Sequence, residues 1–481
     1  MSSSGAAFSS DGVEVIQGSL DVPAKPCTSY ELLDSVYDIK LSVDWIELHQ
    51  LSRVSLQFPD ELLCDSTAVC QRLQEACNSV EFFILGDTSY GSCCVDEVAA
   101  QHYTADSIIH YGHSCLSPTS RFPVLHVFGE AFIDVDDCYE KLSEIFPDKQ
   151  SKVVVLYDVV YAYAMKKLEK LLTMDYTKIV FSSLNVNGSS EKHDETKTVI
   201  DKFGRTFLID AEIQDYSMFY IGEEGLTLSN FILSFNRSQF YSYNPVSFVG
   251  RMENMNVNRS LMRRMCTIEK IKDAKIVGIA VGTLGVSDYQ SIINHLQTVL
   301  KQAGKRSYTF VLGKLNVAKM ANFLEIDAFV LVACAENSLI DSKEFYRPIA
   351  TPYEVELACN RNREWSVEFE SDFRSLLPGG SSFVQLPEKY EETADISLVT
   401  GEVRLLGCND SDDESDEPCQ SGTVANRSEL HVVSHNKATS AAEFLSSRSW
   451  KGVKQKLGET PVVKASQGVK GIASCYENEF S

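Results

Sequence analysis

The chain has 481 residues, and its composition, with 44% hydrophobic and 23% charged residues, is ordinary for a globular protein. This length predicts two to four domains. The formal net charge of −23 argues against a general nucleic-acid-binding surface, because phosphate backbones attract basic surfaces. We therefore expect no direct nucleic-acid partner, whereas a protein partner with basic patches fits this charge.

No targeting or membrane-spanning segment is predicted. Residues 1–20 contain neither a basic region nor an apolar core, so a signal peptide is not expected. The longest apolar runs, such as "KIVGIAVGTLG" and "AFVLVACA", are shorter than the roughly 20 residues that cross a bilayer. We expect a cytoplasmic protein without membrane contact, in which the 14 cysteines are reduced thiols and not a disulfide framework.

After a flexible N-terminus over residues 1–27, the sequence predicts a first α/β domain over residues 28–150. Apolar strand patterns at 53–58, 80–87, 106–112 and 122–129 alternate with helical patterns at 60–78 and 93–103. Cys64, Cys70 and Cys77 lie in the first of these helical patterns, where we expect core or half-buried packing.

Two further segments repeat this alternation, and we assign them to a second domain over 151–250 and a third over 251–402. Their strand patterns include 152–158, 178–184, 206–210, 275–285, 306–313 and 326–334, and their helical patterns include 161–174, 259–274, 289–304 and 316–324. Short buried strands that alternate with helices predict parallel sheets flanked by helices. Three segments of about 100 residues indicate a structural triplication.

The composition changes after the third segment. Residues 403–440 are acidic, polar and without hydrophobic periodicity, which predicts a disordered linker. Serines flanked by acids in this linker are possible phosphorylation sites, although a solvated charge run explains the composition equally directly. In the tail over residues 441–481, Phe444, Leu445 and Trp450 are candidates for docking onto the body or a partner.

Common metal and nucleotide motifs are absent, yet several cysteines follow predicted strands. There is no C-x-x-C pair, no H-E-x-x-H and no P-loop. The adjacent Cys93 and Cys94, then Cys115 and Cys334, each come after a strand, where ligands collect in parallel sheets. Soft thiolates from separate turns suit an iron–sulfur cluster or zinc. Unrelated packing roles for these cysteines remain an alternative at this point.

Polar residues near these turns also have two interpretations. Cys93 and Cys94 precede a predicted helix, whose N-terminus is expected to lower a thiol pKa. His110 and His113 flank the second turn, and His113 is a candidate base or hydrogen-bond donor beside a metal site, or an interior imidazole. Asp87 and Asp96 are candidate acids, although helix capping and a first-turn position explain them too.

Several long motifs resemble one family, the diphthamide synthesis proteins, and within it the eukaryotic second subunits. The motifs occur in the family's order: "LQFPDELL", "GDTSYGSCCVDE", "HYGHSCLSP", "VGTLG", "KMANFLEIDAFVLVACAENS" and "FYRPIATPYEVELA". The tail "FLSSRSWKGV…LGETP…GIASCYENE" is similar to the C-terminal extension of those second subunits. The resemblance covers about residues 28–400 and the tail.

The resemblance implies three related α/β domains around a central 4Fe-4S cluster. In the family's catalytic subunit, S-adenosylmethionine binds the cluster, and reductive cleavage gives a 3-amino-3-carboxypropyl radical that is added to a histidine of elongation factor 2. The implied partners are diphthamide synthesis subunit 1, elongation factor 2 and a small iron-binding electron-donor protein with its reductase. The cofactor supplies the chemistry, and the protein supplies ligation, orientation and exclusion of water.

This sequence departs from the pattern of the catalytic members. They take one cluster cysteine from each domain, whereas here no cysteine occurs between Cys138 and Cys266. Val286, Ser287 and Asp288 stand where catalytic members have Arg-Gln-Gly. The resemblance then implies that S-adenosylmethionine binds in the partner subunit.

The predicted cluster ligands are Cys94, Cys115 and Cys334, with Cys93 as the competitor for the first position. Adjacent side chains are expected to point apart, so Cys93 and Cys94 are not expected to bind together. We predict an accessory subunit whose own cluster supports reduction of the catalytic cluster in subunit 1. The alternatives are a cluster-free partner that stabilises subunit 1 and docks elongation factor 2, and an independently catalytic enzyme, against which the missing second-domain cysteine argues.

Overall fold

In the computed structural model the chain divides into two compact units, Met1–Glu414 and Ser415–Ser481. The described residues are 28–86, 91–119, 121–186, 198–313, 315–340, 345–366, 368–387, 393–406, 471–472 and 475–476. The predicted flexible N-terminus and the tail residues Phe444, Leu445 and Trp450 lie outside them.

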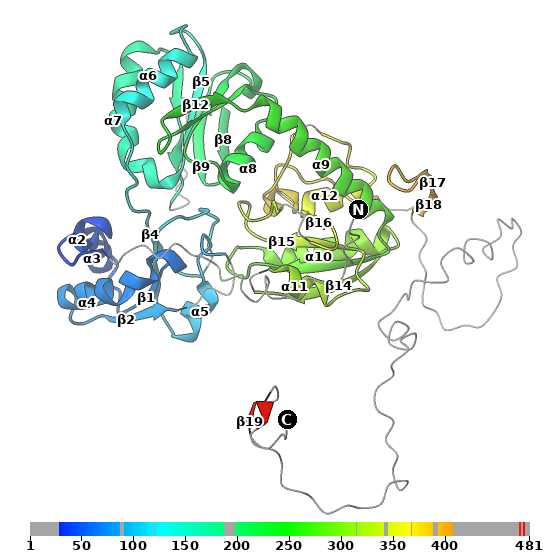
Figure 1. The fold of residues 1–481 in the computed structure, drawn as a ribbon, viewed down its shortest axis with the longest axis horizontal. Helices are drawn as coiled ribbons and strands as arrows, with labels where there is room; N and C mark the ends of the chain where they lie inside the picture. The colour runs from blue at the N-terminus through cyan, green and yellow to red at the C-terminus, as the bar shows by residue number, and fades with distance from the viewer. Residues whose placement is uncertain are drawn as a thin grey trace, which may run out of the picture. The chain divides into compact units, whose positions relative to one another are not determined.

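The first unit begins with a four-stranded parallel sheet of order β2-β1-β3-β4, the first sheet (Figure 1). Its strands are β1 (Arg53–Gln57), β2 (Glu81–Leu85), β3 (Ser107–Tyr111) and β4 (Val124–Val127). Its helices are α2 (Leu33–Val36), α3 (Ile39–Leu48), α4 (Ser66–Ala76) and α5 (Glu97–His102). The predicted helix over 60–78 is a 3₁₀ turn, η1 (Asp60–Asp65), followed by α4. Between them, the Asp65 carboxylate turns inward and accepts from the hydroxyls of Thr28 and Tyr37.

A five-stranded sheet of order β12-β11-β10-β5-β6, the second sheet, follows in the chain. Its strands are β5 (Val153–Tyr157), β6 (Ile179–Phe181), β10 (Ser217–Ile221), β11 (Phe240–Asn244) and β12 (Val249–Met252). Its helices are α6 (Val135–Ile145), α7 (Ala162–Asp175) and α8 (Leu226–Ser234), with the 3₁₀ turns η2 (Val159–Tyr161) and η3 (Ile213–Asp215). A small antiparallel sheet beside it holds β7 (Ser183–Leu184), β8 (Thr198–Lys202) and β9 (Arg205–Ile209).

The third sheet has four parallel strands in the order β14-β13-β15-β16. Its strands are β13 (Ile276–Val281), β14 (Arg306–Val311), β15 (Ala328–Val332) and β16 (Ile349–Ala350). Its helices are α9 (Asn254–Asp273), α10 (Tyr289–Gln302), α11 (Val317–Ala321) and α12 (Pro352–Cys359), with the 3₁₀ turn η4 (Phe373–Leu376).

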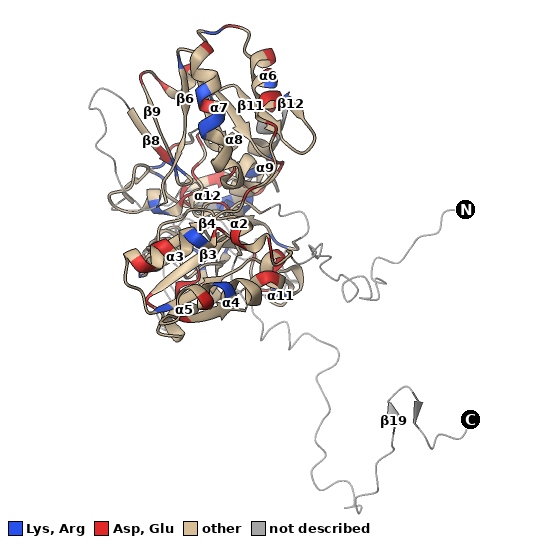
Figure 2. Cartoon of the chain, turned by 90° about the vertical axis from the view of Figure 1, so that its left-hand side faces the viewer, with Lys and Arg blue, Asp and Glu red and all other residues tan. Residues whose placement is uncertain are grey.

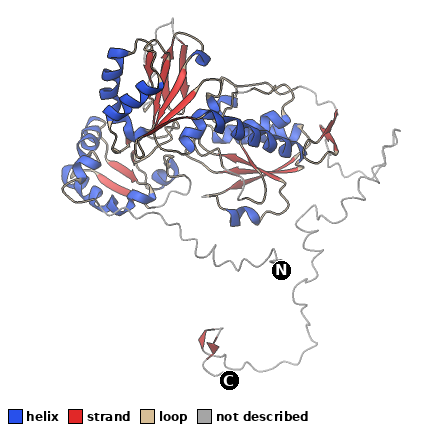
Figure 3. Cartoon of the chain, turned by 45° about the horizontal axis from the view of Figure 1, so that its top comes forward, coloured by secondary structure: helices blue, strands red, loops and turns tan. Residues whose placement is uncertain are grey.

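One strand order recurs in all three sheets. In each, the first strand in the chain lies between the second and the third, and the fourth lies beyond the third: β2-β1-β3-β4, β6-β5-β10-β11 and β14-β13-β15-β16. Helices pack against every one of these sheets (Figure 3). The predicted α/β class with three related parts is therefore confirmed, while the boundaries at residues 150 and 250 remain predictions.

Apolar side chains bury both faces of the second and third sheets. Helices α6 and α7 cover one face of the second sheet around Phe219, and α8 covers the other around Tyr220. Helices α9, α10 and α12 cover one face of the third sheet, and α11 covers the other. The cluster on the α9, α10 and α12 side continues into the cysteine loops of the first sheet, so burial of apolar surface holds the first and third sheets together there.

Other sequence expectations have mixed outcomes. Cys77 is buried and Cys70 half-buried as predicted, but Cys64 is exposed at the 3₁₀ turn η1. The first four residues of the predicted linker form β18 (Val403–Leu406), which pairs with β17 (Thr393–Ile396). The rest of the linker lies outside the described residues.

Charges of both signs occur on the helices, for example on α6 and α7 (Figure 2). Among the described residues, no helix combines the length and the apolar character that crossing a membrane requires. The second unit contributes only a short antiparallel pair to the described residues, β19 (Gly471–Ile472) and β20 (Cys475–Tyr476).

Candidate metal centre

Four buried cysteines converge where the carboxyl ends of the first and third sheets meet. Cys93 and Cys94 follow β2, Cys115 follows β3, and Cys334 follows β15. The Sγ–Sγ distances are 3.9 Å for Cys93–Cys94, 3.7 Å for Cys93–Cys334 and 3.8 Å for Cys94–Cys115. All four sulfurs lie within 4.8 Å of one another, so the structure brings together the three predicted ligands and their competitor.

The expectation that Cys93 and Cys94 point apart is wrong. It holds for a strand, where successive side chains alternate between the two faces, but these residues lie in a turn. The turn is closed by a hydrogen bond from the Cys94 N–H to the Gly91 carbonyl, at 3.2 Å. Both thiols therefore face the same small space, and both are available to one metal centre.

Buried polar side chains hold this turn against the first sheet. Gln57, at the end of β1, donates from Nε2 to the Cys94 carbonyl at 2.8 Å and accepts from the Asp96 N–H at 2.9 Å. His110, in β3, contacts the Ser92 carbonyl through Nε2 at 3.1 Å. Burial lowers the pKa of His110 to about 4, so its ring is neutral and Nε2 carries the proton that it donates.

A glycine in the turn after β13 of the third sheet permits close contact with the cysteine turn. A Cβ on Gly285, in the "GTLG" turn after β13, would lie 2.2 Å from the Val95 carbonyl oxygen. The Ser287 N–H also donates to the Pro118 carbonyl at 3.3 Å. The turn after β13 thus packs against the cysteine loops.

The four thiols share hydrogen bonds that favour ionisation at one position. Contacts with Cys334, then with Cys93 and Cys94, hold the pKa of the Cys115 thiol well below its usual value. The contact with Cys115 is the largest cause of the raised pKa of the Cys93, Cys94 and Cys334 thiols. The pKa of Cys93 and Cys94 is thus raised, and not lowered as expected for thiols that precede a helix, although contacts with Cys334 and Cys93 partly lower the pKa of Cys94.

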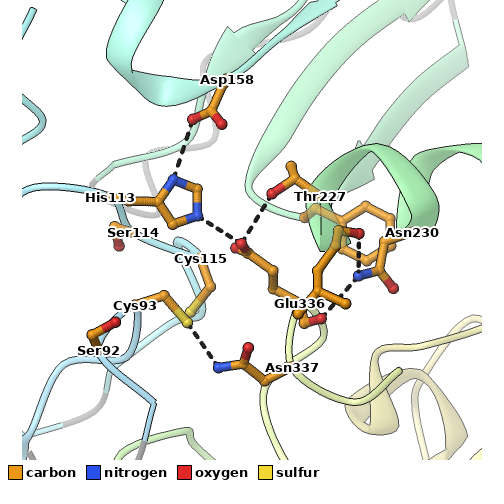
Figure 4. Close-up of polar contacts among 12 residues, drawn as sticks. Ser92, Cys93, His113, Ser114, Cys115, Asp158, Thr227, Asn230, Glu336 and Asn337 are labelled. Carbon is orange, nitrogen blue, oxygen red and sulfur yellow. Dashed lines mark hydrogen bonds and ion pairs between the residues drawn. The ribbon is translucent and has the colours of Figure 1, made fainter. Parts of the chain in front are cut away.

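His113 connects the three sheets beside the thiols (Figure 4). It follows β3, and its Nδ1 lies 3.2 Å from the Asp158 carboxylate, which follows β5. Its Nε2 lies 2.6 Å from the carboxylate of Glu336, which follows β15. Burial opposes the charge on His113, but the hydrogen bonds that its ring donates to both carboxylates outweigh this effect and raise the pKa of His113 to about 10. The ring is therefore an imidazolium at neutral pH.

Hydrogen-bond donors also reach the sulfurs themselves. Asn337 donates from Nδ2 to Cys93 Sγ at 3.2 Å and from its backbone N–H to Cys334 Sγ at 3.4 Å. Donors such as Asn337 stabilise negative charge on thiolate sulfur. The Cys115 thiol, in contrast, donates to the Ser117 hydroxyl oxygen at 3.3 Å.

The donor set fits a thiolate-bound metal centre in number, softness and burial. The distances between the four sulfurs are shorter than those between the cysteine sulfurs of a cubane cluster, in which each thiolate binds a different iron. A single tetrahedral ion with metal–sulfur bonds of about 2.3 Å places its sulfurs about 3.8 Å apart, which matches the observed 3.7–3.9 Å. Binding of a cluster therefore requires the sulfurs to move apart, while three of the six sulfur–sulfur distances match a single ion and the others lie within 4.8 Å.

Comparisons with known proteins agree on one family. Residues 58–370 match the family model for putative diphthamide synthesis proteins. The chain is 49% identical over 479 residues to 2-(3-amino-3-carboxypropyl)histidine synthase subunit 2 of Gallus gallus, covering 98% of both chains. The chain belongs to the diphthamide synthesis family. The subunit of the same name from Schizosaccharomyces pombe is 39% identical over 93% of this chain and 92% of its own length.

The fold of this diphthamide synthesis family member is also similar to that of a solved structure. The crystal structure of Dph2 from Pyrococcus horikoshii with a 4Fe-4S cluster matches with a TM-score of 0.52 and 20% identity. The match covers 69% of this chain and 93% of the archaeal chain. At this identity it supports the architecture of the three sheets.

Other residues singled out in this family member take up structural positions. Asp96 is the N-cap of α5 and accepts from the Ala99 N–H at 2.9 Å, while Asp87 lies outside the described residues. Val286 is buried in the core, and Asp288 precedes α10 with a φ of 64°. The sequence did not predict the roles of Gln57 and Asn337, because each contacts the turn from a distant part of the chain, with no local motif to mark it.

Proposed function

We propose that this chain is the accessory iron–sulfur subunit of the heterodimeric 3-amino-3-carboxypropyl transferase of the cytoplasm. The enzyme modifies a histidine of elongation factor 2 with S-adenosylmethionine, in the first step of diphthamide biosynthesis. The observation that carries the proposal is the convergence of four buried thiols in a member of this family. The name shared by the relatives, a histidine synthase subunit 2, supports the heterodimer and the reaction.

Cys94, Cys115 and Cys334 would hold a 4Fe-4S cluster, and the orientation of Cys93 supports it as a fourth ligand. A bound cluster would supply one-electron transfer. Among the residues of the chain, Asn337 donates to sulfur, Gln57 holds the Cys94 loop, and the buried setting excludes water. The nearby imidazolium of His113 offsets part of the negative charge that four thiolates bring to the site.

Two departures from the catalytic pattern support an accessory role. All four converging thiols come from the loops of the first and third sheets, and β5, β10 and their following loops contribute none. Val286, where catalytic members have arginine, is an apolar residue buried in the core. S-adenosylmethionine is therefore assigned to subunit 1. This chain passes electrons from a small iron-binding donor protein with its reductase to the catalytic cluster in subunit 1.

A second candidate function follows from the sulfur spacing. A single tetrahedral zinc or iron ion would match three of the six sulfur–sulfur distances, and the other three lie within 4.8 Å. Such an ion would pin the first sheet to the third, and the chain would then act as a structural partner that stabilises subunit 1 and docks elongation factor 2.

Serine variants of the cysteines in the heterodimer test the proposal. Replacing Cys94, Cys115 or Cys334 by serine, one at a time, is expected to lower iron and sulfide in this chain and to slow modification of elongation factor 2, measured by mass spectrometry. Cys266→Ser is the matched control, because Cys266 is exposed on α9. Full iron content and full modification in all three variants would show that these thiols do not hold a cluster.

A further inference from the structure

Among the described residues, Asn337 brings a polar side chain into contact with a sulfur of the metal centre. Its Nδ2 lies 3.2 Å from Cys93 Sγ, and its backbone N–H lies 3.4 Å from Cys334 Sγ. One residue thus donates to two of the four sulfurs, one from each of the sheets that meet at the centre. A sulfur that carries negative charge can only accept here, so the amide must present its NH₂ group and not its oxygen to Cys93.

Contacts of the preceding residue hold the turn that carries Asn337. The preceding residue, Glu336, is held by three contacts: its carboxylate meets His113 at 2.6 Å and Thr227 at 2.9 Å, and its carbonyl accepts from Asn230 at 2.9 Å. The turn carrying Asn337 is therefore tied to both the first and the second sheets.

Gly91 leaves the space that the amide occupies. A Cβ at Gly91 would lie 2.2 Å from Asn337 Nδ2, far inside any real contact distance. The Gly91 backbone does not have a positive φ, so the small residue is explained here by this close approach and not by backbone strain. The glycine of the cysteine turn and the asparagine after β15 therefore act as a matched pair.

From this geometry we infer that Asn337 sets the reduction potential of the cluster. The inference rests on the proposed function and deepens it. In the step concerned, one electron passes to the oxidised cluster from a one-electron reductant, which is the iron-binding donor protein of the proposed function or dithionite in the test. No covalent bond is made or broken, and Asn337 keeps its protons. The added charge spreads onto the sulfurs, so the two N–H donors stabilise the reduced state more than the oxidised state. Asn337 is thus a positioning residue that makes the cluster easier to reduce.

The test compares midpoint potentials in the full-length chain, purified anaerobically and reconstituted with iron and sulfide. Asn337→Leu removes the side-chain donor at similar volume, and Asn337→Asp replaces it with a charged acceptor. Dithionite titrations followed by electron paramagnetic resonance are expected to give potentials in the order wild type, leucine variant, aspartate variant, from highest to lowest. The leucine variant should be about tenfold harder to reduce, which is about 59 mV for a one-electron couple.

Two further variants guard this test against a purely structural effect. Gly91→Ala leaves the chemistry of Asn337 unchanged but displaces its amide, so it should lower the potential in the same direction. Asn322→Leu is the matched control, because Asn322 is exposed at the C-cap of α11, and its potential should equal that of the wild type.

The possible outcomes separate this inference from the proposed function. Normal cluster content with unchanged potentials in the leucine and aspartate variants would overturn the tuning role and leave the proposed function intact. Loss of the cluster in both variants would also overturn it, because Asn337 would then serve assembly. A wild-type chain that takes up no iron and sulfide would overturn the proposed function and the inference together.

Discussion

His113 links the first, second and third sheets, because its ring nitrogens contact Asp158 and Glu336 at 3.2 Å and 2.6 Å. His113→Ala would leave these two largely buried carboxylates facing each other without the intervening positive charge. Two charge-assisted hydrogen bonds contribute about 3 to 6 kcal/mol in full. Because the His113 ring is 34% exposed, water screens part of this hydrogen-bond energy. The expected loss of local stability in His113→Ala is therefore roughly 2 to 3 kcal/mol.

Hydrogen exchange measured by mass spectrometry resolves where this loss falls. Peptides covering residues 112–118 and 334–340 should exchange at least about 30-fold faster in His113→Ala, since each 1.4 kcal/mol is a factor of about ten. His102→Ala is the matched control, because His102 is exposed in the last turn of α5. If both peptides exchanged at the wild-type rate in the His113 variant, the bridge between the sheets would contribute nothing, and the interpretation of His113 would be wrong.

Three further predictions concern the framework of the centre. Arg264→Met leaves the fully buried Glu354 carboxylate without its guanidinium partner, so the free energy of unfolding measured in urea should fall by about 3 to 5 kcal/mol. Adding Glu354→Gln should restore most of this stability. If the double variant recovered no stability, the pairing would be refuted. Burial raises the pKa of Asp65, but hydrogen bonds from Thr28 and Tyr37 outweigh burial and lower the pKa overall. The ionised Asp65 therefore stabilises the fold at pH values above its unfolded pKa near 3.9, and this stabilisation disappears as the pH falls through the folded pKa. Urea midpoints between about pH 5 and pH 2 should therefore fall less steeply in Asp65→Asn than in the wild type, and parallel curves would contradict this. Gly285→Ala should reduce bound iron because its Cβ meets the cysteine turn at 2.2 Å, whereas equal iron in this variant and the wild type would show that the turn yields without cost.

The sequence patterns predicted the sheets and the ends of the strands well. Runs such as residues 153–157 are apolar throughout, which is typical of a strand buried on both faces, and β5 is fully buried. Because the carboxyl ends of parallel strands gather at one edge, the placement of Cys94, Cys115 and Cys334 after strands was enough to predict that they lie near the same edge of their sheets.

Contacts between distant residues could not be predicted in the same way. Gln57 meets the Cys94 loop across 37 residues, and Asn337 meets Cys93 across 244 residues, so neither contact leaves a local pattern. The orientation of Cys93 depends on a turn conformation, which an alternation rule derived from strands misrepresents. His113 was identified as a candidate, but its two carboxylate partners come from other sheets.

The stoichiometry of the bound metal is the most direct test of the iron–sulfur assignment. Iron, zinc and acid-labile sulfide should be counted per chain in the anaerobically purified full-length protein, with and without subunit 1. A 4Fe-4S cluster predicts about four iron and four sulfide per chain. One zinc or one iron per chain without sulfide would contradict the cluster and favour the single tetrahedral ion that the sulfur spacing also fits.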